Sequence, residues 1–323
     1  MEERKLQIKA ARGEMNKLGA VMIVYYLIMN ATVSIAMLAD TSIYLIRALV
    51  NDTPLGLGDV FDHLIGTATS NGWGYILAIA AGIVILLLWK GKGFFGEMFA
   101  REKQMTPGVF AALLCMFLLP QALLQVYAPA LEWVLNQMGL SAMAALEMAT
   151  IQTNTISMFL YVAFLGPIAE ELLFRGLLIR ILRPYGKQAA IVVSAISFGL
   201  FHGNIIQIPF AFLVGLVLGY VTVEYSVIWA IVLHMINNFV LSDLIGRLEK
   251  IAPELASVLF FLIIIAAAIG AVVLLIVKRD QVKDYFRNNK VGAVAWKGLV
   301  SSVAMWIFAV MMLLSALLTI TPI

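Results

Sequence analysis

Two adjacent glutamates and an arginine lie within one apolar run, and their spacing separates their roles. Residues 166–176 read G-P-I-A-E-E-L-L-F-R-G. On a helix that turns about 100° per residue, Glu171 and Arg175 lie about 40° apart and form an i, i+4 pair that neutralises both charges. Glu170 points about 100° away from Glu171. The spacing therefore predicts one paired carboxylate and one carboxylate, Glu170, that faces another partner.

Two later apolar runs carry polar residues at the same helical spacing. Phe198 and His202 share one helix face, and His234 and Asn238 share another. At a rise of 1.5 Å per residue, Glu170 and these three polar groups lie about 15 to 22 Å from the same predicted side of the membrane. We therefore expect Glu170, His202, His234 and Asn238 to meet in one layer of the bilayer.

A carboxylate and an imidazole around one water can remove its proton and leave a nucleophile for a peptide carbonyl. On this basis Glu170 is predicted to be the general base, with His202 positioning the water. The N–H groups of His234 and Asn238 are predicted to form the oxyanion hole. Three further residues are assigned supporting roles, namely Glu171, Arg175 and Phe198. Asn237, the remaining polar residue of this region, receives no role.

The composition indicates that membrane helices position these groups. Of the 323 residues, 62% are hydrophobic and 13% are charged, and the mean hydropathy is +0.96. These values are typical of a multi-pass membrane protein, in which each span is a helix because lipid offers no partner to an unpaired backbone group. We expect an all-α fold of about eight or nine transmembrane helices in a single integral membrane domain, 1–323, with its catalytic core at about 155–245. The apolar runs are 18–39, 74–89, 108–129, 155–182, 188–204, 207–223, 226–245, 255–277 and 298–320.

Lysine and arginine are distributed unequally between the segments that connect these runs. Eighteen of the 22 lie in 1–17, 90–107, 180–187 and 278–297, and the segments of the opposite side hold three. Short positively charged segments stay on the cytoplasmic side. The pattern predicts a multi-pass protein of the cell membrane with its N-terminus in the cytoplasm and its C-terminus outside.

Two long segments fall on the predicted outer side, 40–72 and 130–154. Both are partly amphipathic, and we expect them either to lie along the membrane surface or to form ordinary folded loops. His63, in the first of them, is interpreted as a solvated side chain.

Small residues predict where helices approach or bend. Gly199 with Gly203, and Gly215 with Gly219, form G-x-x-x-G pairs on successive runs, a spacing that allows close packing of helix backbones. The dipeptide Gly166-Pro167, just before the glutamates, is expected to loosen or bend its helix.

These motifs, in this order on successive hydrophobic segments, resemble those of the CAAX protease and bacteriocin-processing family, also called the Abi family. The three are E-E-x-x-x-R (Glu170, Glu171, Arg175), F-x-x-x-H (Phe198, His202) and H-x-x-x-N (His234, Asn238). The resemblance covers about residues 155–245. It implies an intramembrane glutamate-type endopeptidase with a core of about eight helices and a site open towards the cytosol. It also implies that Glu170 and His202 activate water and that His234 and Asn238 form the oxyanion hole. We expect no cofactor, with Zn²⁺ as the alternative described below.

The expected partners are a hydrophobic or membrane-bound peptide and the lipid bilayer, and the formal charge of +3 is too small to suggest a nucleic acid. The interval of 32 positions between His202 and His234 is similar to that of bacterial family members. Eukaryotic and archaeal relatives, which process prenylated CAAX proteins, have a longer interval.

Other readings use the same residues. Zn²⁺ on His202, His234 and Glu170, with Glu171 as base, would make a zinc peptidase. A catalytically silent scaffold or a bacteriocin-immunity-type protein could share the fold, and the Glu-Glu-Arg cluster would then only tie helices together. A proton-coupled transporter is a further alternative, because intramembrane Glu and His relay protons.

Overall fold

The chain folds into a nearly all-helical bundle. The computed structural model describes residues 2–143 and 155–323. The α-helices are α1 (Glu2–Val50), α2 (Leu57–Ser70), α3 (Trp73–Met98), α4 (Pro107–Asn136), α6 (Ile156–Leu160), α7 (Gly166–Glu171), α8 (Arg180–Leu182), α9 (Lys187–Phe201), α10 (Gln207–Glu224), α11 (Val227–Ile236), α12 (Ile245–Ile251), α13 (Pro253–Val277), α14 (Arg279–Asn288), α15 (Ala293–Val300) and α16 (Val303–Leu317). Three π-helical segments, η1 (Tyr161–Leu165), η2 (Leu172–Ile179) and η4 (Asn237–Leu244), and one 3-10 turn, η3 (Arg183–Tyr185), lie between them. One antiparallel pair, β1 (Leu140–Ser141) with β2 (Thr321–Pro322), is the exception to the predicted all-α fold.

The described residues contain seven helices that are long and apolar enough to cross a membrane, or eight if one bent pair counts as a single span. All nine predicted apolar runs fall on helices, but two of them differ from a simple span. α9 has only 15 residues, and α15 and α16 meet at a bend of 60°. The chain is therefore a polytopic membrane protein, as predicted. Its described residues contain seven or eight candidate spans, where the apolar runs suggested nine.

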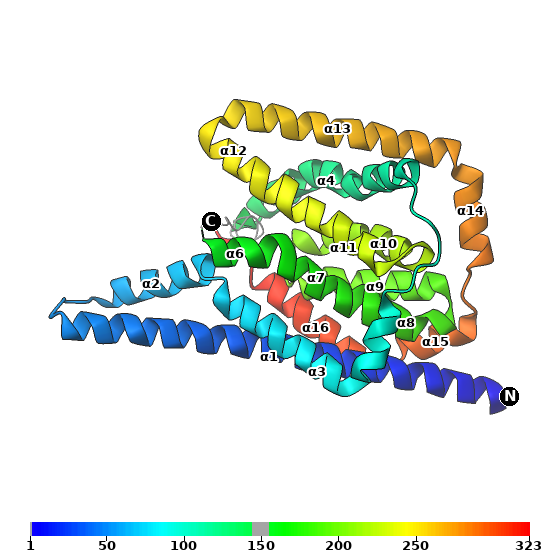
Figure 1. The fold of residues 1–323 in the computed structure, drawn as a ribbon, viewed down its shortest axis with the longest axis horizontal. Helices are drawn as coiled ribbons and strands as arrows, with labels where there is room; N and C mark the ends of the chain where they lie inside the picture. Colours follow the sequence, from blue (N-terminus) through cyan, green and yellow to red (C-terminus); the bar gives the residue numbers. More distant parts are fainter. Residues whose placement is uncertain (1, 144–154) are drawn as a thin grey trace.

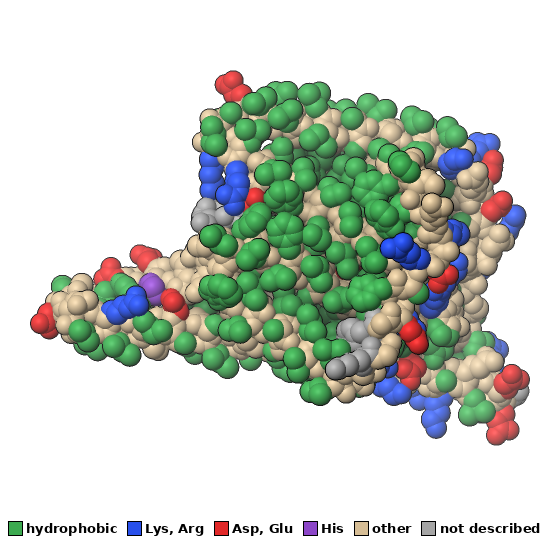
Figure 2. All heavy atoms as spheres, in the orientation of Figure 1, with side chains coloured by type: hydrophobic (Ala, Val, Ile, Leu, Met, Phe, Trp, Pro, Cys, Tyr) green, Lys and Arg blue, Asp and Glu red, His purple; other side chains and the backbone are tan. Residues whose placement is uncertain are grey.

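The helices form a layered bundle with charged ends. Figure 1 shows α1 and α3 along one edge, α4 and α13 along the opposite edge, and the helices α6 to α11 between them. The two chain termini lie at opposite ends of the bundle (Figure 1). Figure 2 shows apolar side chains across the middle of this face, with lysine, arginine, aspartate and glutamate gathered towards the two ends. Such a band is the surface that lipid tails cover in a membrane protein.

The predicted outer segment 40–72 is mostly helical. α1 extends into it as far as Val50, a turn and loop follow at 51–56, and α2 returns beside α1 (Figure 1). The prediction for His63 is wrong, because this side chain is in contact with α1. Its Nε2 lies 3.0 Å from Asp40 Oδ2, and its ring stacks on Tyr44 with 4.0 Å between centroids. Residues 144–154 of the second outer segment lie outside the described residues.

Glycines bring α9 and α10 into close contact, as the small-residue pattern predicts. A Cβ added at Gly199 would lie 2.7 Å from the Ile208 carbonyl oxygen, and one at Gly215 would lie 3.0 Å from Ala195 Cα. Gly203 has a different role, because its φ of +54° ends α9 directly after His202.

One charged cluster joins several of the segments that were predicted to be cytoplasmic. Glu224, at the end of α10, accepts hydrogen bonds from Lys103, from Lys187 Nζ at 2.7 Å and from the Tyr285 hydroxyl at 3.1 Å. The loop after α3, the start of α9 and α14 therefore lie at the same end of the bundle. This agrees with the span assignment made from the positive segments.

Candidate active site

The helix that carries the two glutamates is wound irregularly just before them. Thr155 begins this helix by accepting a hydrogen bond from Met158 N at 3.2 Å. In η1 the Gly166 N–H bonds to the Tyr161 carbonyl, five residues back, and α7 then begins with Pro167 in its first turn. Pro167 has no N–H, so the carbonyls of this turn lose a regular partner. The predicted loosening at Gly166-Pro167 is thus a π-helical turn.

Glu171 forms the predicted pair with Arg175 and a further contact that helical spacing did not reveal. Arg175 Nη1 donates to Glu171 Oε1 at 3.1 Å, and both side chains are fully buried. His234 Nδ1 lies 2.9 Å from the same Oε1. Because an ionised carboxylate only accepts hydrogen bonds, His234 Nδ1 carries the proton. Glu171 therefore orients two side chains. One is the ring of His234, which comes from α11, and the other is the guanidinium of Arg175 on its own helix.

The arginine is held by packing as much as by hydrogen bonds. Its guanidinium lies over the ring of Phe198, with the carbon 4.1 Å from the ring centroid. Gly215 leaves room for it, since a Cβ there would lie 3.2 Å from Arg175 Nη2. Among the described residues, Nε and Nη2 of Arg175 and Oε2 of Glu171 have no hydrogen-bond partner. A buried cation over an aromatic face gains electrostatic stabilisation from the ring.

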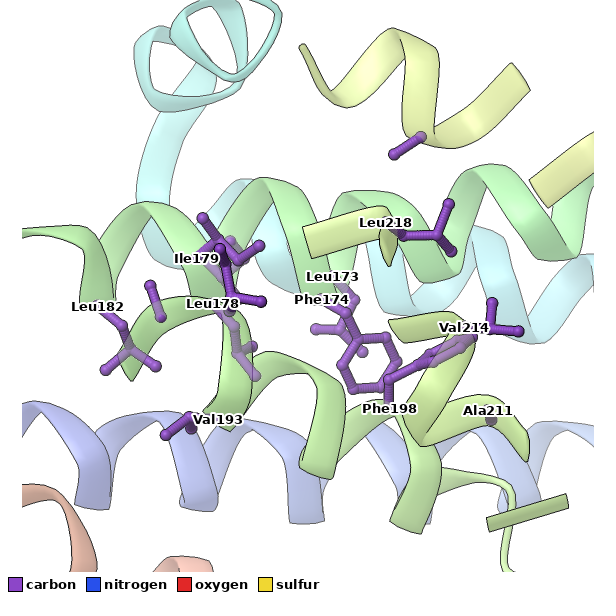
Figure 3. Close-up of a cluster of buried hydrophobic side chains, with 14 of the residues drawn as sticks. Leu173, Phe174, Leu178, Ile179, Leu182, Val193, Phe198, Ala211, Val214 and Leu218 are labelled. Atoms are coloured by element: carbon purple, nitrogen blue, oxygen red, sulfur yellow. The ribbon is translucent and has the colours of Figure 1, made fainter. Parts of the chain in front are cut away.

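Phe198 is the centre of the aromatic packing beneath the site. Its ring packs edge to face on Phe174 at 5.3 Å, and Figure 3 shows these two rings side by side. The rings of His202 and His234 lie 4.8 Å and 5.8 Å from it, both nearly perpendicular. The F-x-x-x-H spacing thus places His202 against this buried ring, and the packing of α11 brings His234 to the same ring.

His202 and Glu170 lie beside this cluster with more exposure to solvent. His202 Nδ1 donates to the Phe198 carbonyl at 2.8 Å, because a carbonyl can only accept, so the neutral ring has its lone pair on Nε2. The Glu170 side chain is 29% exposed, and its Oε2 lies 3.7 Å from His234 Nε2. The ring of Tyr25 from α1 lies 6.0 Å from the ring of Phe201, the residue directly before His202.

Asn238 is the end of a row of three carboxamides. Its Nδ2 donates to the Val162 carbonyl at 2.9 Å, and its Oδ1 accepts from Asn237 Nδ2 at 3.0 Å. Asn237 Oδ1 in turn accepts from Gln121 Nε2 at 2.8 Å. One N–H of Asn238 is therefore used inside the protein, and the second remains for another acceptor.

The structure brings Glu170, His234 and the Phe198–His202 face together, and it places Asn238 one turn beyond His234. Two groups near the site were missed from the sequence, Tyr25 of α1 and Gln121 of α4, and both lie in helices far from the motifs. Asn237, which directly precedes Asn238, was noted as polar but was given no role. Gln121 carried a usable signal, since it is a carboxamide inside the apolar run 108–129. Within the described part of the chain, no three His, Cys, Asp or Glu side chains lie close enough together to hold a metal ion.

Comparison with known proteins agrees with the motifs. Residues 152–240 match the family described as Type II CAAX prenyl endopeptidase Rce1-like. No curated protein and no solved structure matched the chain significantly. The matched segment contains every motif residue and begins and ends close to the predicted core. The chain is thus a membrane-embedded protein whose residues 152–240 match the Rce1-like family, which confirms the predicted resemblance to the CAAX protease and bacteriocin-processing family of intramembrane peptidases.

Proposed function

We propose that this protein is a glutamate-type intramembrane endopeptidase that hydrolyses a peptide bond of a membrane-associated or hydrophobic peptide. The observation that supports the proposal best is the difference between the two adjacent glutamates. Glu171 is fully buried and bonded to Arg175 and His234. Glu170 is partly exposed and, among the described residues, has no ion pair with a lysine or arginine. A partly exposed carboxylate that is not paired with a lysine or arginine can accept a proton from water.

Glu170 acts as the general base. In the proposed reaction its carboxylate takes one proton from a water molecule, and the lone pair on His202 Nε2 accepts a hydrogen bond from the same water. The hydroxide that forms attacks the peptide carbonyl. The proton held by Glu170 then passes to the nitrogen of the leaving peptide as the tetrahedral intermediate breaks down.

His234 and Asn238 stabilise the oxyanion of that intermediate. Asn238 offers its second N–H, because the first is bound to the Val162 carbonyl. His234 offers Nε2, which faces Glu170, while Glu171 holds Nδ1–H. A donor role for Nε2 requires a proton on this nitrogen as well, so the proposal assigns the doubly protonated ring to the reaction.

The substrate reaches this site from the membrane or from its cytoplasmic face. Three predicted cytoplasmic segments converge on Glu224 at one end of the bundle, which supports placing these three segments on the same side of the membrane. The family description supports a peptide substrate, and its prenylated CAAX class is one substrate class to compare with unmodified hydrophobic peptides.

Purified protein in detergent tests this function with two substrates, an unmodified hydrophobic peptide library and a farnesylated CAAX peptide. The wild type should cleave at least one of them, and both Glu170→Ala and His202→Ala should abolish cleavage. Glu254→Ala, at an exposed position at the start of α13, is the control that should remain active.

Three results would contradict the proposal. Full activity of Glu170→Ala would remove the general base. Loss of wild-type activity on chelation, with recovery on adding Zn²⁺, would support the zinc peptidase instead. If no peptide is cleaved, and wild type and Glu170→Ala support the same cellular phenotype, the protein acts as a scaffold.

A further inference from the structure

A row of carboxamides connects α4 to the proposed oxyanion hole. Gln121 is 9% exposed, and its Nε2 donates to Asn237 Oδ1 at 2.8 Å. Asn237 Nδ2 donates to Asn238 Oδ1 at 3.0 Å, and Asn238 Nδ2 donates to the Val162 carbonyl at 2.9 Å. The row thus begins outside the family-matched segment 152–240 and ends on a residue of the E-E-x-x-x-R helix.

Two contacts hold this row in one direction, the Val162 carbonyl at one end and the NH₂ group of Gln121 at the other. A backbone carbonyl can only accept, so Asn238 must present its NH₂ group to it and turn its Oδ1 towards Asn237. Asn237 must then present its own NH₂ group to Asn238, and its Oδ1 is left to accept from Gln121. Each amide therefore has one permitted orientation. Reversing Asn237 or Asn238 breaks two hydrogen bonds, and reversing Gln121 breaks one.

Pro167 explains why the Val162 carbonyl takes part. In a regular α-helix this carbonyl would accept from the Gly166 N–H, but Gly166 bonds to Tyr161 instead. In the π register its partner would be residue 167, which is a proline without an N–H. The carbonyl is therefore available to a side chain, and Asn238 of η4 reaches it.

We propose that Gln121 is a positioning residue for the peptidase reaction, acting through Asn237 to orient the Asn238 amide so that its free N–H, and not its oxygen, faces the substrate. The inference rests on the proposed function, because it gives Asn238 an oxyanion to stabilise. If the row were reversed, Asn238 would turn an acceptor oxygen towards the negative charge of the intermediate.

Gln121→Glu tests this most directly, since it keeps the shape and replaces the donor with a carboxylate that can only accept. We expect kcat to fall about 10- to 100-fold with KM nearly unchanged, as for loss or displacement of one oxyanion-hole donor. The ratio of variant to wild-type kcat should rise as the pH falls, because the protonated carboxyl can again donate to Asn237 Oδ1. Gln125→Glu, one turn further along α4 and exposed, is the matched control and should show neither effect.

A double-mutant cycle separates positioning from a general structural role. In an Asn238→Ala background, Gln121→Glu should cause no further loss of kcat, because its target is gone. A full additional loss in that background would overturn the proposal, and so would a variant with wild-type kcat. If Gln121→Glu does not fold, Asn237→Asp interrupts the same row at a partly exposed residue and should give the same kcat loss and the same non-additivity.

A spectroscopic measurement can test the positioning role of Gln121 without measuring catalysis. In asparagine-labelled protein, the side-chain NH₂ resonances of Asn238 should shift in Gln121→Glu and stay in place in Gln125→Glu. Unchanged resonances would overturn the positioning role even in an active enzyme. A shift in a protein that cleaves no peptide would support the amide row and contradict only the proposed function.

Discussion

Two buried glutamates, Glu224 at one end of the bundle and Glu171 in its middle, differ in how completely their carboxylate oxygens are hydrogen-bonded. Glu224 has both carboxylate oxygens occupied, one by Lys103 and the other by Lys187 and Tyr285, and its partners reach towards the aqueous end. Glu171 lies in the apolar middle, where Arg175 and His234 share one oxygen and the second has no partner among the described residues. A fully satisfied carboxylate joins segments of the chain. A partly satisfied one, beside the partly exposed Glu170, orients a histidine.

The cationic partners of the two glutamates also differ in their exposure to solvent. Lys103 and Lys187 keep 61% and 33% of their side chains exposed, so Glu224 has cations that remain hydrated if the cluster is broken. Arg175 is fully buried and has no such alternative. Removing a partner should therefore be far more damaging in the middle of the bundle than at its end.

The largest effect on stability is expected for Arg175→Met, which keeps much of the side-chain volume and removes the charge. It leaves the Glu171 carboxylate buried without its cation, so we expect a loss of about 3–5 kcal/mol, measured by chemical unfolding in detergent. Arg180→Met, one turn later and partly exposed in its pair with Glu97, is the control and should change stability by about 0–1 kcal/mol. A stable but inactive Arg175→Met would instead place the arginine in contact with substrate.

Glu224→Gln is expected to have an intermediate effect that does not reach the site. The charge-assisted bonds to two lysines weaken, and we expect a loss of about 1–3 kcal/mol of stability at neutral pH. The kcat for a hydrophobic peptide should stay within about twofold of wild type, because no reacting group is touched. A large loss of kcat with normal stability would show that Glu224 and the candidate active site are coupled, and it would contradict the purely structural role given to Glu224.

Phe198→Leu should have a smaller effect on stability and a specific effect on catalysis. The substitution removes the ring beneath Arg175 and between the two histidines, and we expect about 1–2 kcal/mol of destabilisation. Because His202 and His234 lose a common support, kcat should fall by about 10-fold while KM changes little. Equal activity at saturating peptide would show that the ring serves packing alone.

The smallest effect is expected at the surface pair Glu102–Arg183. The Arg183 hydrogen bond lowers the pKa of Glu102 below its usual value of 4.5. Its contribution to stability is therefore present above pH 4.5 and is lost as the pH falls through the lowered pKa. Since the side chain is 41% exposed, Glu102→Gln should change stability at pH 7 by about 0–1 kcal/mol, and the difference from wild type should vanish in acid. A larger change at pH 7 that persists in acid would contradict this surface assignment.

Helical periodicity was sufficient to predict the parts of the site that lie on one helix. The Glu171–Arg175 pair and the Phe198–His202 face follow from i, i+4 spacing, and both form. The apolar runs likewise predicted the bundle of helices. What spacing could not give is the partner across helices, such as Glu171 for His234 Nδ1.

Other features depend on local backbone register and on distant segments. The π-helical turn at Tyr161–Leu165 changes which carbonyl is free, and an apolar run looks the same in either register. Gln121 and Tyr25 approach the site from α4 and α1, and only the packing of those helices brings them there. His63 was misassigned for the same reason, because Asp40 and Tyr44 lie on another helix.

The most direct test of the account compares Glu170→Gln with Glu224→Gln, using one hydrophobic peptide and protein preparations matched for folding. We expect Glu170→Gln to lose at least about 100-fold in kcat, since a general base contributes a factor of this size, while its melting temperature stays close to that of wild type. Glu224→Gln should show the reverse, with normal kcat and a lower melting temperature. Retention of kcat within a few-fold of wild type in Glu170→Gln would contradict the central claim.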